Sequence, residues 1–585
     1  MKSLYKLNTY ILRYKKLLIT GTIFILISNI FALYPAEFVR HALNYVENNF
    51  NNVSSIKDTN MILLKYSSLI ILFAILKGIF MYFMRQTIIV MSRKIEFDLK
   101  NDIYKKYQTL DLSFYKKNNI GDLMNRITED VSRVRMYLGP AIMYAINMIF
   151  LFSLVISKMF YVSTTLTLYV LIPLPILAIT VFYVSNKINK NSERVQRQLS
   201  SLTSISQENF SAINIIKTFR NENSSFKYFV KNCKEYTRNQ LKLASVEAWF
   251  FPLIILLIGF STIITIYIGG IESINKKIST GNIAEFIIYI NMLTWPVASI
   301  GWVTSLIQRS AASMKRINEF LESESEIKNI SNQKNIIKGD IVFKNVSFTY
   351  KDTGIKGLKN INLKIKENTT LGIFGKTGSG KSTIANLICR LYDPISGVIE
   401  IDNKNIKELN LYELRKTIGY VPQDGFLFSG TISENVIFGN DSNTNDNIIR
   451  AIKNAEILEE INNFKNKLNT IVGERGVQLS GGQRQRISIA RAIYINPSIY
   501  IFDDCLSAVD ANKERKILNN LKKITNRSTN IIISHRVASL KHANHIIVLD
   551  KGSIIEEGNH EELKKSNGFY SQMYKKQTIE ELSNT

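Results

Sequence analysis

The chain has 585 residues, a length that predicts two to four domains at roughly 150 residues each. Its 46% hydrophobic residues exclude a disordered or fibrous protein, and its 21% charged residues exclude a bundle embedded entirely in a membrane. The net charge of +26 fits either a nucleic-acid surface or the cytoplasmic bias of a membrane protein. Cys233, Cys389 and Cys505 lie far apart, so neither a disulfide framework nor a zinc site is indicated.

Six apolar runs in the first half are long enough to cross a bilayer. They cover Leu17 to Tyr34 and then, approximately, Ser68 to Val90, Tyr137 to Ser157, Met159 to Val184, Trp249 to Gly269 and Ile283 to Ile307. The first run lacks a cleavage site of small residues, so we expect it to remain as an anchor. An even number of crossings returns the chain to its starting side.

Lys and Arg crowd the first 16 residues and the long segments 91–136 and 185–246, whereas the alternating loops near 41–67, 158 and 270–282 hold few. The positive-inside bias therefore predicts a multi-pass protein of the inner (plasma) membrane, with both termini and the long arms in the cytoplasm. Much of the positive charge is thus explained by the orientation of the chain in the membrane, and we expect no nucleic-acid partner. Leu4, Leu7 and Ile11 predict either a short helix on the inner membrane surface or a basic flank of the first crossing.

Both long arms carry amphipathic helical patterns that extend the crossings into the cytoplasm. Gly121 to Val131 and Glu208 to Arg220 hold matching places in the two arms. From the residues alone, these segments are solvated helices with one apolar face.

Charged residues also lie in or near the apolar runs. Lys77 and Arg85 fall within the second run. Either they meet an anionic lipid headgroup, or they extend toward the interfaces or pair with a neighbouring helix. Glu37 and Arg40, near the outer end of the first crossing, are expected to be solvated.

After a polar stretch around Glu322 to Lys338, short β-type runs begin at Asp340 to Tyr350 and Leu358 to Ile365. The predicted fold is an α-helical six-helix transmembrane domain followed by an α/β domain. The expected boundaries are 1–320 for the membrane domain, 321–339 for a linker, 340–576 for the α/β domain and 577–585 for a C-terminal tail.

A short strand, Leu371 to Phe374, leads directly into a glycine-rich loop, and a helical stretch, Thr383 to Leu391, follows. This is G-x-x-x-x-G-K-S in a strand–loop–helix setting, where glycines let backbone N–H groups surround phosphate oxygens at a helix N-terminus. The residues predicted to bind ATP are Gly375, Lys376, Thr377, Gly378, Ser379, Gly380, Lys381, Ser382 and Thr383. Lys381 would reach the β- and γ-phosphates, and Ser382 would bind Mg²⁺. The α/β domain is therefore predicted to be a P-loop ATPase domain.

Ser498 to Phe502 is a further apolar strand that ends in two carboxylates. Asp503 is predicted to hold Mg²⁺, and Asp504 to face an attacking water. Between the two motifs, Leu479 to Gln483 offers one serine hydroxyl and two glycine amides that could close over a γ-phosphate.

In this order and spacing, the motifs resemble those of a half-transporter of the ATP-binding cassette (ABC) exporter family, and the resemblance covers nearly the whole chain. It implies ATP-driven export or flipping of a hydrophobic or amphipathic compound, such as a drug or a membrane lipid, by alternating access of a dimer. It implies that the two arm segments are coupling helices and that 470–476 precedes the signature. The resemblance also implies roles for single residues: Tyr350 stacks on adenine, Gln423 binds Mg²⁺ and senses the cytoplasmic arms, and His535 contacts the γ-phosphate. It implies that the signature segment completes the ATP site of the partner cassette; its residues are Ser480, Gly481, Gly482 and Gln483. The loop 507–510, which includes Asp510, would be exchanged between the two cassettes.

Asp504 departs from that family pattern, because members active in hydrolysis usually have glutamate there as the general base. The shorter side chain sets the carboxylate back by roughly 1.5 Å, and a misplacement of about 1 Å can cost on the order of a hundredfold in rate. This favours a heterodimer in which the chain supplies the impaired site, whereas the matching Tyr350, Gln423 and His535 keep a slow homodimer open. Two other interpretations are a regulatory or ATP-gated membrane protein with little hydrolysis of its own, and a soluble cassette ATPase acting on ribosomes or DNA, which would have no spanning helices.

Overall fold

A computed structural model describes residues 2–48, 56–331, 333, 336–439, 445–473, 476, 479–507, 509–524 and 527–583. The chain divides into two compact units, Met1–Gln108 with Gly121–Ser323 and Thr109–Ile120 with Glu324–Thr585, and each is described by itself. Outside the described residues lie Ala508 of the predicted exchanged loop, 474–475 of the segment before the signature, 332, 334 and 335 of the linker, and 584–585 of the tail.

The described residues of the first unit form helices and the short turns between them, without a strand. In chain order its elements are η1 (Lys2–Leu7), α1 (Asn8–Arg13), α2 (Lys15–Asn48), α3 (Ile56–Thr109), α5 (Ile120–Asn125), η3 (Arg126–Asp130), α6 (Val131–Met136), η4 (Tyr137–Ala141), α7 (Ile142–Val162), α8 (Thr164–Leu171), α9 (Pro173–Ser211), α10 (Ile213–Thr218), α11 (Glu222–Ile274) and α12 (Thr280–Glu322).

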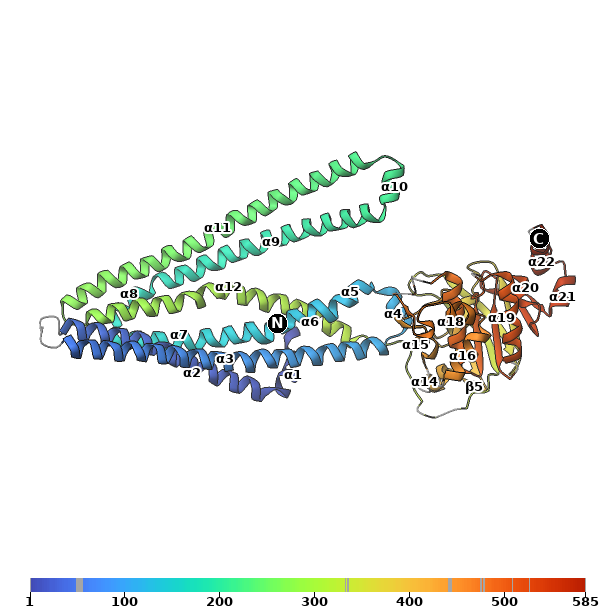
Figure 1. The fold of residues 1–585 in the computed structure, drawn as a ribbon, viewed down its shortest axis with the longest axis horizontal. Helices are drawn as coiled ribbons and strands as arrows, with labels where there is room; N and C mark the ends of the chain where they lie inside the picture. Colours follow the sequence, from blue (N-terminus) through green and yellow to red (C-terminus); the bar gives the residue numbers. More distant parts are fainter. Residues whose placement is uncertain are drawn as a thin grey trace. The chain divides into compact units, whose positions relative to one another are not determined.

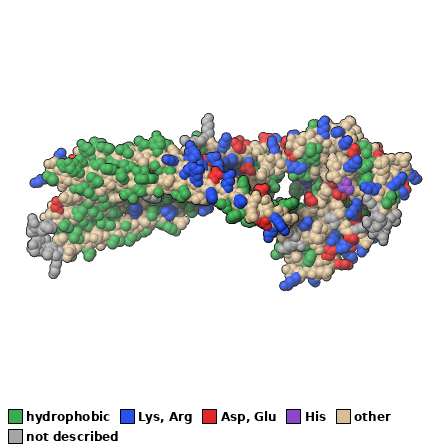
Figure 2. Space-filling model, turned by 90° about the horizontal axis from the view of Figure 1, so that it is seen from above, with side chains coloured by type: hydrophobic (Ala, Val, Ile, Leu, Met, Phe, Trp, Pro, Cys, Tyr) green, Lys and Arg blue, Asp and Glu red, His purple; other side chains and the backbone are tan. Residues whose placement is uncertain are grey.

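Six stretches of the described residues are long and apolar enough to cross a membrane, as predicted. They are Lys15–Asn48, Thr59–Thr109, Ile120–Val162, Thr164–Ser211, Glu222–Ile274 and Thr280–Glu322. Figure 2 shows hydrophobic side chains over much of the visible face of this helical unit, with Lys and Arg side chains gathered at one end of the apolar band. At 1.5 Å per residue, the 54 residues of α3 reach about 80 Å, well beyond a bilayer core.

The turn between the third and fourth crossings differs from the prediction, which placed it near residue 158. The structure places it at Ser163, whose backbone is extended and whose hydroxyl accepts a hydrogen bond from the N–H of Leu166. Lys158 stays inside α7 because it forms an ion pair with Glu37 of α2. A charge in an apolar run therefore marks a paired residue here and not a loop.

The N-terminal segment packs on other helices of its unit and does not form a free surface helix. Leu7 is fully buried, and the Ser3 hydroxyl donates to the carbonyl of Ala311 in α12 at 2.8 Å. The Tyr10 hydroxyl donates to Asp102 of α3 at 2.7 Å. Neither sequence interpretation, a helix on the membrane surface or a basic flank of the first crossing, included these contacts with α12 and α3.

The charges near the outer end of the first crossing are paired, which corrects the expectation that they are solvated. Arg40 contacts Glu285 of α12 at 3.1 Å, and Glu285 also accepts a hydrogen bond from Tyr289 at 2.8 Å. Glu37 pairs with Lys158 as above. In contrast, Lys77 and Arg85 are exposed, and neither forms an ion pair within the described part of the chain.

The second arm consists of α9 and α11, which run side by side and are joined by the short helix α10 (Figure 1). The predicted segment Glu208 to Arg220 contains that short helix. The first arm differs from the prediction, because Gly121 to Val131 continue the long helical run of the first unit. The part of that arm grouped with the ATPase unit is instead Thr109–Ile120, which contains α4 (Leu112–Lys117).

The second unit mixes helices and sheets. Its strands are β1 (Ile341–Thr349), β2 (Lys356–Ile365), β3 (Thr370–Gly375), β4 (Ser396–Ile401), β5 (Lys404–Asn405), β6 (Ile418–Val421), β7 (Gly430–Thr431), β8 (Ile471–Val472), β9 (Ile499–Asp503), β10 (Thr529–Ile533), β11 (His545–Asp550) and β12 (Ser553–Gly558). Besides α4, its helices are α13 (Lys381–Ile388), α14 (Leu411–Lys416), α15 (Ile432–Ile437), α16 (Asn445–Asn454), α17 (Leu458–Asn462), η5 (Lys467–Asn469), α18 (Gly481–Ile495), α19 (Ala511–Ile524), α20 (Val537–Leu540), α21 (His560–Lys565) and α22 (Phe569–Ser583).

A six-stranded sheet with the order β12-β11-β3-β10-β9-β6 forms the centre of this unit. Its strands pair in parallel except for β12, which is antiparallel to β11. A four-stranded antiparallel sheet has the order β2-β1-β4-β5, and β7 pairs with β8.

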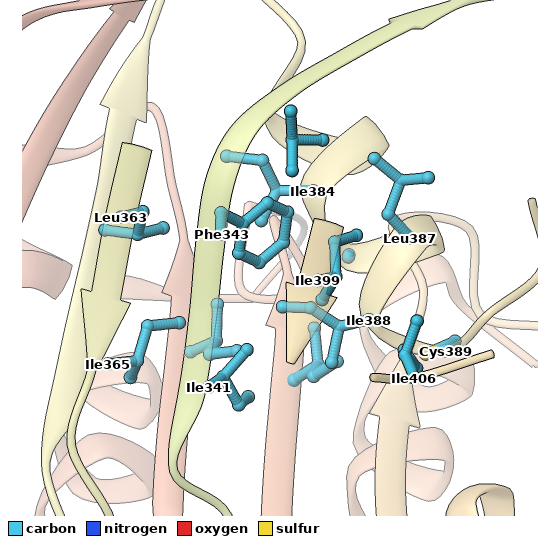
Figure 3. Close-up of a cluster of buried hydrophobic side chains, with 14 of the residues drawn as sticks. Ile341, Phe343, Leu363, Ile365, Ile384, Leu387, Ile388, Cys389, Ile399 and Ile406 are labelled. Atoms are coloured by element: carbon cyan, nitrogen blue, oxygen red, sulfur yellow. The ribbon is translucent and has the colours of Figure 1, made fainter. Parts of the chain in front are cut away.

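The main core of the unit lies between these layers and fixes α13. Ile384, Leu387 and Ile388 follow one another at i, i+3 and i+4, so they share one face of the helix. Figure 3 shows this face turned toward Phe343 of β1 and Ile399 of β4, and all five side chains are buried. The packing sets the position of the N-terminus of α13, where the glycine-rich loop ends.

Candidate nucleotide-binding site

The chemistry-bearing residues gather at one edge of the six-stranded sheet. The glycine-rich loop follows β3, His535 follows β10, Asp503 and Asp504 end β9, and Gln423 follows β6. These four strands are neighbours and run parallel, so their carboxyl ends meet at the same edge. Residues separated by more than 150 positions in the chain are brought together in this way.

The glycine-rich loop is shaped by glycines that no other residue could replace without strain. Gly380 has φ of 104°, and a Cβ there would lie 2.3 Å from the carbonyl oxygen of Gly357. Gly375 has φ of 153°, and its Cβ would lie 2.3 Å from the carbonyl oxygen of Leu549. The backbone therefore closes tightly around the position that a phosphate would take.

Lys381 folds its side chain back into this loop. Its ammonium donates to the carbonyl oxygens of Gly375 at 2.9 Å and Lys376 at 2.8 Å, and the residue is 6% exposed. Burial lowers the pKa of Lys381 to about 8, against the opposing effect of Asp504 and Asp503. No ion pair holds this ammonium among the described residues, so it is available to an anion.

Ser382 and Asp503 are brought together as the sequence predicted they would be for a Mg²⁺ site. The Ser382 hydroxyl donates to Asp503 Oδ1 at 3.0 Å, and the Tyr420 hydroxyl lies 3.4 Å from Oδ2. Burial raises the pKa of Asp503 despite these donors. A hydroxyl and a carboxylate oxygen are ligands that Mg²⁺ accepts, so the pair fits that ion.

The Ser379 hydroxyl is a second group in the loop that fits a bound phosphate. Its hydroxyl is buried and has no hydrogen-bond partner among the described residues. Buried polar atoms normally have partners, and a phosphate oxygen over the loop would provide one. Lys376, Thr377 and Gly378 form the exposed side of the same loop.

Asp504 and His535 complete the edge. Asp504 is 9% exposed, has φ of 45°, and its N–H donates to the carbonyl oxygen of Ile533 at 2.9 Å. Aspartate is one of the few side chains that tolerate this left-handed backbone. Burial and the nearby Lys381 lower the pKa of His535, so its imidazole is mostly neutral at pH 7.

Tyr350 and Gln423 lie beside this group. The Tyr350 hydroxyl is 3.0 Å from Oγ1 of Thr383, and the ammonium of Lys116 lies 4.9 Å from the centre of the Tyr350 ring. Gln423 has an exposed side chain, two residues beyond the end of β6.

The signature segment lies at the start of α18, apart from the phosphate loop. Ser480 and Gln483 form a reciprocal capping box, and the Gln483 amide also donates to Glu460 at 3.1 Å. No hydrogen bond or ion pair links Ser480–Gln483 to the loop of Lys381 in the described ranges. Asp510 caps α19 by accepting from the N–H of Asn512 at 3.1 Å.

Glu460 is a residue of this region that the sequence analysis did not find. It accepts hydrogen bonds from the Arg486 guanidinium at 2.8 Å and from Gln483, and it pairs with Lys513 of α19. These partners lower the pKa of Glu460 to about 2, although burial acts in the opposite direction. Glu460 belongs to no motif, and its partners lie 23 to 53 positions away, so no local signal could have revealed it.

Tyr420 was also missed. It lies one residue before the end of β6, and the alternation of that strand would have allowed its side chain to be placed near Asp503 only once the strand order was known.

Comparisons with known proteins cover both units. Residues 18–297 match the family model of the ABC transporter transmembrane region, and residues 358–507 match that of the ABC transporter. The chain is 36% identical to the probable multidrug resistance ABC transporter ATP-binding/permease protein YheI of Bacillus subtilis, over 80% of this chain and 81% of that protein. It is 30% identical to the ATP-dependent lipid A-core flippase 1 of Colwellia psychrerythraea, over 87% of each chain.

A solved structure shares the fold. The structure of a bacterial Atm1-family ABC exporter with ATP bound superposes with a TM-score of 0.79 at 23% identity, over 96% of this chain and 98% of that chain. The order of six spanning helices and a nucleotide-binding unit is therefore that of a solved exporter.

Proposed function

The chain belongs to the ABC transporter family as an ATP-driven exporter, and on that premise we propose that it is one half of a dimer that moves a hydrophobic or amphipathic compound outward by alternating access. It is a multi-pass membrane protein with a cytoplasmic ATPase domain, whose hydrolysis of ATP is coupled to transport. The names of its relatives support a drug or a lipid as the compound. The charge distribution supports the inner membrane, with both termini in the cytoplasm.

The observation that carries the proposal is the separation of two half-sites in one chain. Lys381, Ser382 and Asp503 gather at the sheet edge, whereas Ser480 to Gln483 start a helix elsewhere in the unit. A helix N-terminus with bare glycine amides is suited to bind the far side of a phosphate. A second cassette, placed head to tail, would bring such a segment over the phosphate loop of this chain.

The tip of the second arm supports a partner as well. Phe210 is 76% exposed, Ile215 62% and Phe219 77%, all around the short helix α10. Apolar side chains gathered at the end of a cytoplasmic arm favour contact with another protein surface. We propose that this tip docks on the partner's cassette.

The residues of the sheet edge have distinct tasks in this scheme. Lys381 would leave the two carbonyl oxygens that it contacts and bind the β- and γ-phosphates, and Ser379 would donate its free hydroxyl. Ser382, Asp503 and Gln423 would hold Mg²⁺, which neutralises charge on the phosphates. His535 would contact the γ-phosphate and report its presence.

Asp504 favours a heterodimer. It stands at the end of β9 where an attacking water would be activated, but its carboxylate is one methylene shorter than that of glutamate. Hydrolysis at this chain's own phosphate loop is then slow, while its Ser480 to Gln483 segment completes a competent site on the partner. A slow homodimer is the alternative within the same scheme.

The test is purification from the native membrane followed by reconstitution. We expect a second cassette subunit to co-purify, and vesicles containing the complex to show ATP-dependent transport of a fluorescent lipid or drug. A Lys381→Ala chain should assemble equally well but lose ATP binding at its own phosphate loop. A stable monomer that hydrolyses ATP at full rate would contradict the proposal.

Asp504 also supports a second candidate, a regulatory or ATP-gated membrane protein that binds ATP with little turnover. Vanadate-sensitive phosphate release should rise in an Asp504→Glu variant if the site is otherwise competent. Absence of release even in that variant, together with nucleotide-dependent opening of the helices, would favour this second function over export.

A further inference from the structure

Helix α22 packs against the ATPase unit along one face. Tyr570, Met573, Tyr574 and Gln577 are spaced i, i+3, i+4 and i+7, which places them in one row on a helix. Tyr570 is fully buried, and Met573 and Tyr574 are partly buried in the same cluster. Gln577 occupies the last position of this row and carries an amide where an apolar side chain would continue the packing.

The Gln577 side-chain amide forms hydrogen bonds with the backbone on both sides of Arg536. Its Nε2 donates to the carbonyl oxygen of His535 at 2.8 Å, and its Oε1 accepts from the N–H of Val537 at 2.8 Å. Both distances are those of well-formed hydrogen bonds. The side chain therefore fixes the peptide planes of the turn that follows β10.

The opposite side of this turn is tied to α19. Arg536 donates its backbone N–H to the Ser534 hydroxyl at 3.0 Å, and its guanidinium contacts Glu514 of α19 at 2.5 Å. Arg536 and Gln577 hold the turn from two directions. Of these contacts, the bond from Gln577 to the carbonyl oxygen of His535 acts directly on the residue that carries the imidazole.

The same helix contacts the strand that leads into the phosphate loop. The Tyr570 ring lies 5.5 Å from that of Phe374, the residue directly before Gly375. One helix is thereby anchored on β3 at its start and on the turn of His535 at its middle.

We propose that Gln577 is a positioning residue, which holds the backbone of His535 so that the imidazole reaches the γ-phosphate of bound ATP. The inference rests on the proposed function, because it requires His535 to contact that phosphate. Loss of the two hydrogen bonds would let the turn move, and the chain would distinguish ATP from ADP less well. Binding of the adenine and of the first two phosphates would not change.

The experiment compares ATP with ADP on the full-length chain in nanodiscs with Mg²⁺. Each nucleotide displaces a fluorescent ATP analogue, and an Asp504→Asn background prevents turnover in all samples. We expect His535→Ala to lower the preference for ATP over ADP about tenfold, the size of one hydrogen bond to a charged group. Gln577→Leu should lower it by about threefold or more, and the double variant should be no worse than His535→Ala alone, because the two residues act through one contact.

Two further variants separate positioning from general stability. Thr578→Val removes a hydroxyl that bonds only the carbonyl oxygen of Tyr574 in the same helix, so the preference should be unchanged. Gln577→Glu keeps the acceptor for Val537 but sets a carboxylate oxygen against the carbonyl oxygen of His535, so it should act like Gln577→Leu even if the latter does not fold.

Three outcomes would overturn the inference. In the first, Gln577→Leu and Gln577→Glu leave the preference for ATP over ADP intact while His535→Ala lowers it. In the second, the double variant loses the product of the two single losses, as expected of residues that act independently. If His535→Ala itself has no effect, the proposed γ-phosphate contact fails first, and the role of Gln577 fails with it.

Discussion

Lys381 in the ATPase unit and Glu285 in the six-helix unit are both buried charged side chains, but the groups that hold them differ in kind. Lys381 is 6% exposed, and within the described part of the chain its ammonium donates only to carbonyl oxygens of its own loop. Glu285 is 1% exposed and faces the guanidinium of Arg40 at 3.1 Å. A buried charge held by neutral dipoles can exchange them for a ligand, whereas a buried charge held by an opposite charge has its partner already.

Glu460 shows that the difference follows the environment and not the unit. It lies in the ATPase unit, yet its carboxylate is enclosed by Arg486, Lys513 and Gln483. By the same rule it is a fixed support for the signature segment and not a ligand site. The comparison therefore assigns Lys381 to binding and Glu285 and Glu460 to structure.

The largest expected effect is on Lys381. Lys381→Met keeps the length of the side chain but removes its charge, so ATP affinity should fall by about a hundredfold or more while the melting temperature stays within a few degrees. Fluorescent-nucleotide binding and thermal unfolding of the purified chain measure the two quantities. Lys359→Met, at an exposed lysine of β2, is the control and should bind normally. Unaltered affinity in Lys381→Met would break the comparison.

For Glu285 the pattern should be reversed. Glu285→Leu leaves Arg40 partly buried without its carboxylate, which should destabilise the six-helix unit by about 2–3 kcal/mol, while ATP affinity stays the same. Thermal unfolding in nanodiscs would detect the loss. Adding Arg40→Leu should recover much of it, because an apolar pair replaces an ion pair without a desolvation cost. A loss of ATP affinity in the single variant would contradict the structural assignment.

Glu460 should give a smaller loss of stability together with a loss of turnover. Glu460→Gln removes the carboxylate from the buried Arg486, at a cost of about 2 kcal/mol given the partial exposure of the pair. A single acceptor oxygen would remain for Arg486, Lys513 and Gln483, which now share two, so the start of α18 should be held less firmly and ATPase activity of the assembled exporter should fall severalfold. Glu459→Gln is the matched control, since that neighbour is exposed. Equal behaviour of the two variants would argue against a supporting role.

The smallest effect concerns pH. With a pKa of about 8 in the nucleotide-free chain, Lys381 is mostly protonated at pH 7 and mostly neutral at pH 9. Only the ammonium attracts phosphate, so ATP affinity should be nearly full at pH 7, about half at pH 8 and about tenfold lower at pH 9. In Lys381→Arg the guanidinium stays charged, so the curve should be flatter. A steep fall that persists in this variant would point to another group.

The strands that lead to the phosphate loop and to Asp503 could be predicted because their signals are local. Gly375 to Ser382 and Asp503 each form part of a motif with its own strand, and parallel strands place their ends together once the strand order is known. The six spans were predicted for the same reason, since a run of apolar residues is a local property.

The features that the sequence did not predict depend on residues far apart in the chain. Glu37 and Arg40 look solvated until α7 and α12 are placed beside them with Lys158 and Glu285. Leu7 has the spacing of a surface helix, yet it is buried within its helical unit. No periodicity within one segment encodes such partners.

The position of β3 has a consequence for how the ATPase unit folds. This strand pairs with β10 and β11, and Thr370 is 160 residues from its neighbour Asn530. During synthesis the glycine-rich loop therefore emerges long before the strands that support it, and it must wait unsupported while they are translated. Pairing over such a distance makes folding slow. Newly made chains therefore expose this loop to chaperones and proteases until β10 and β11 have been translated.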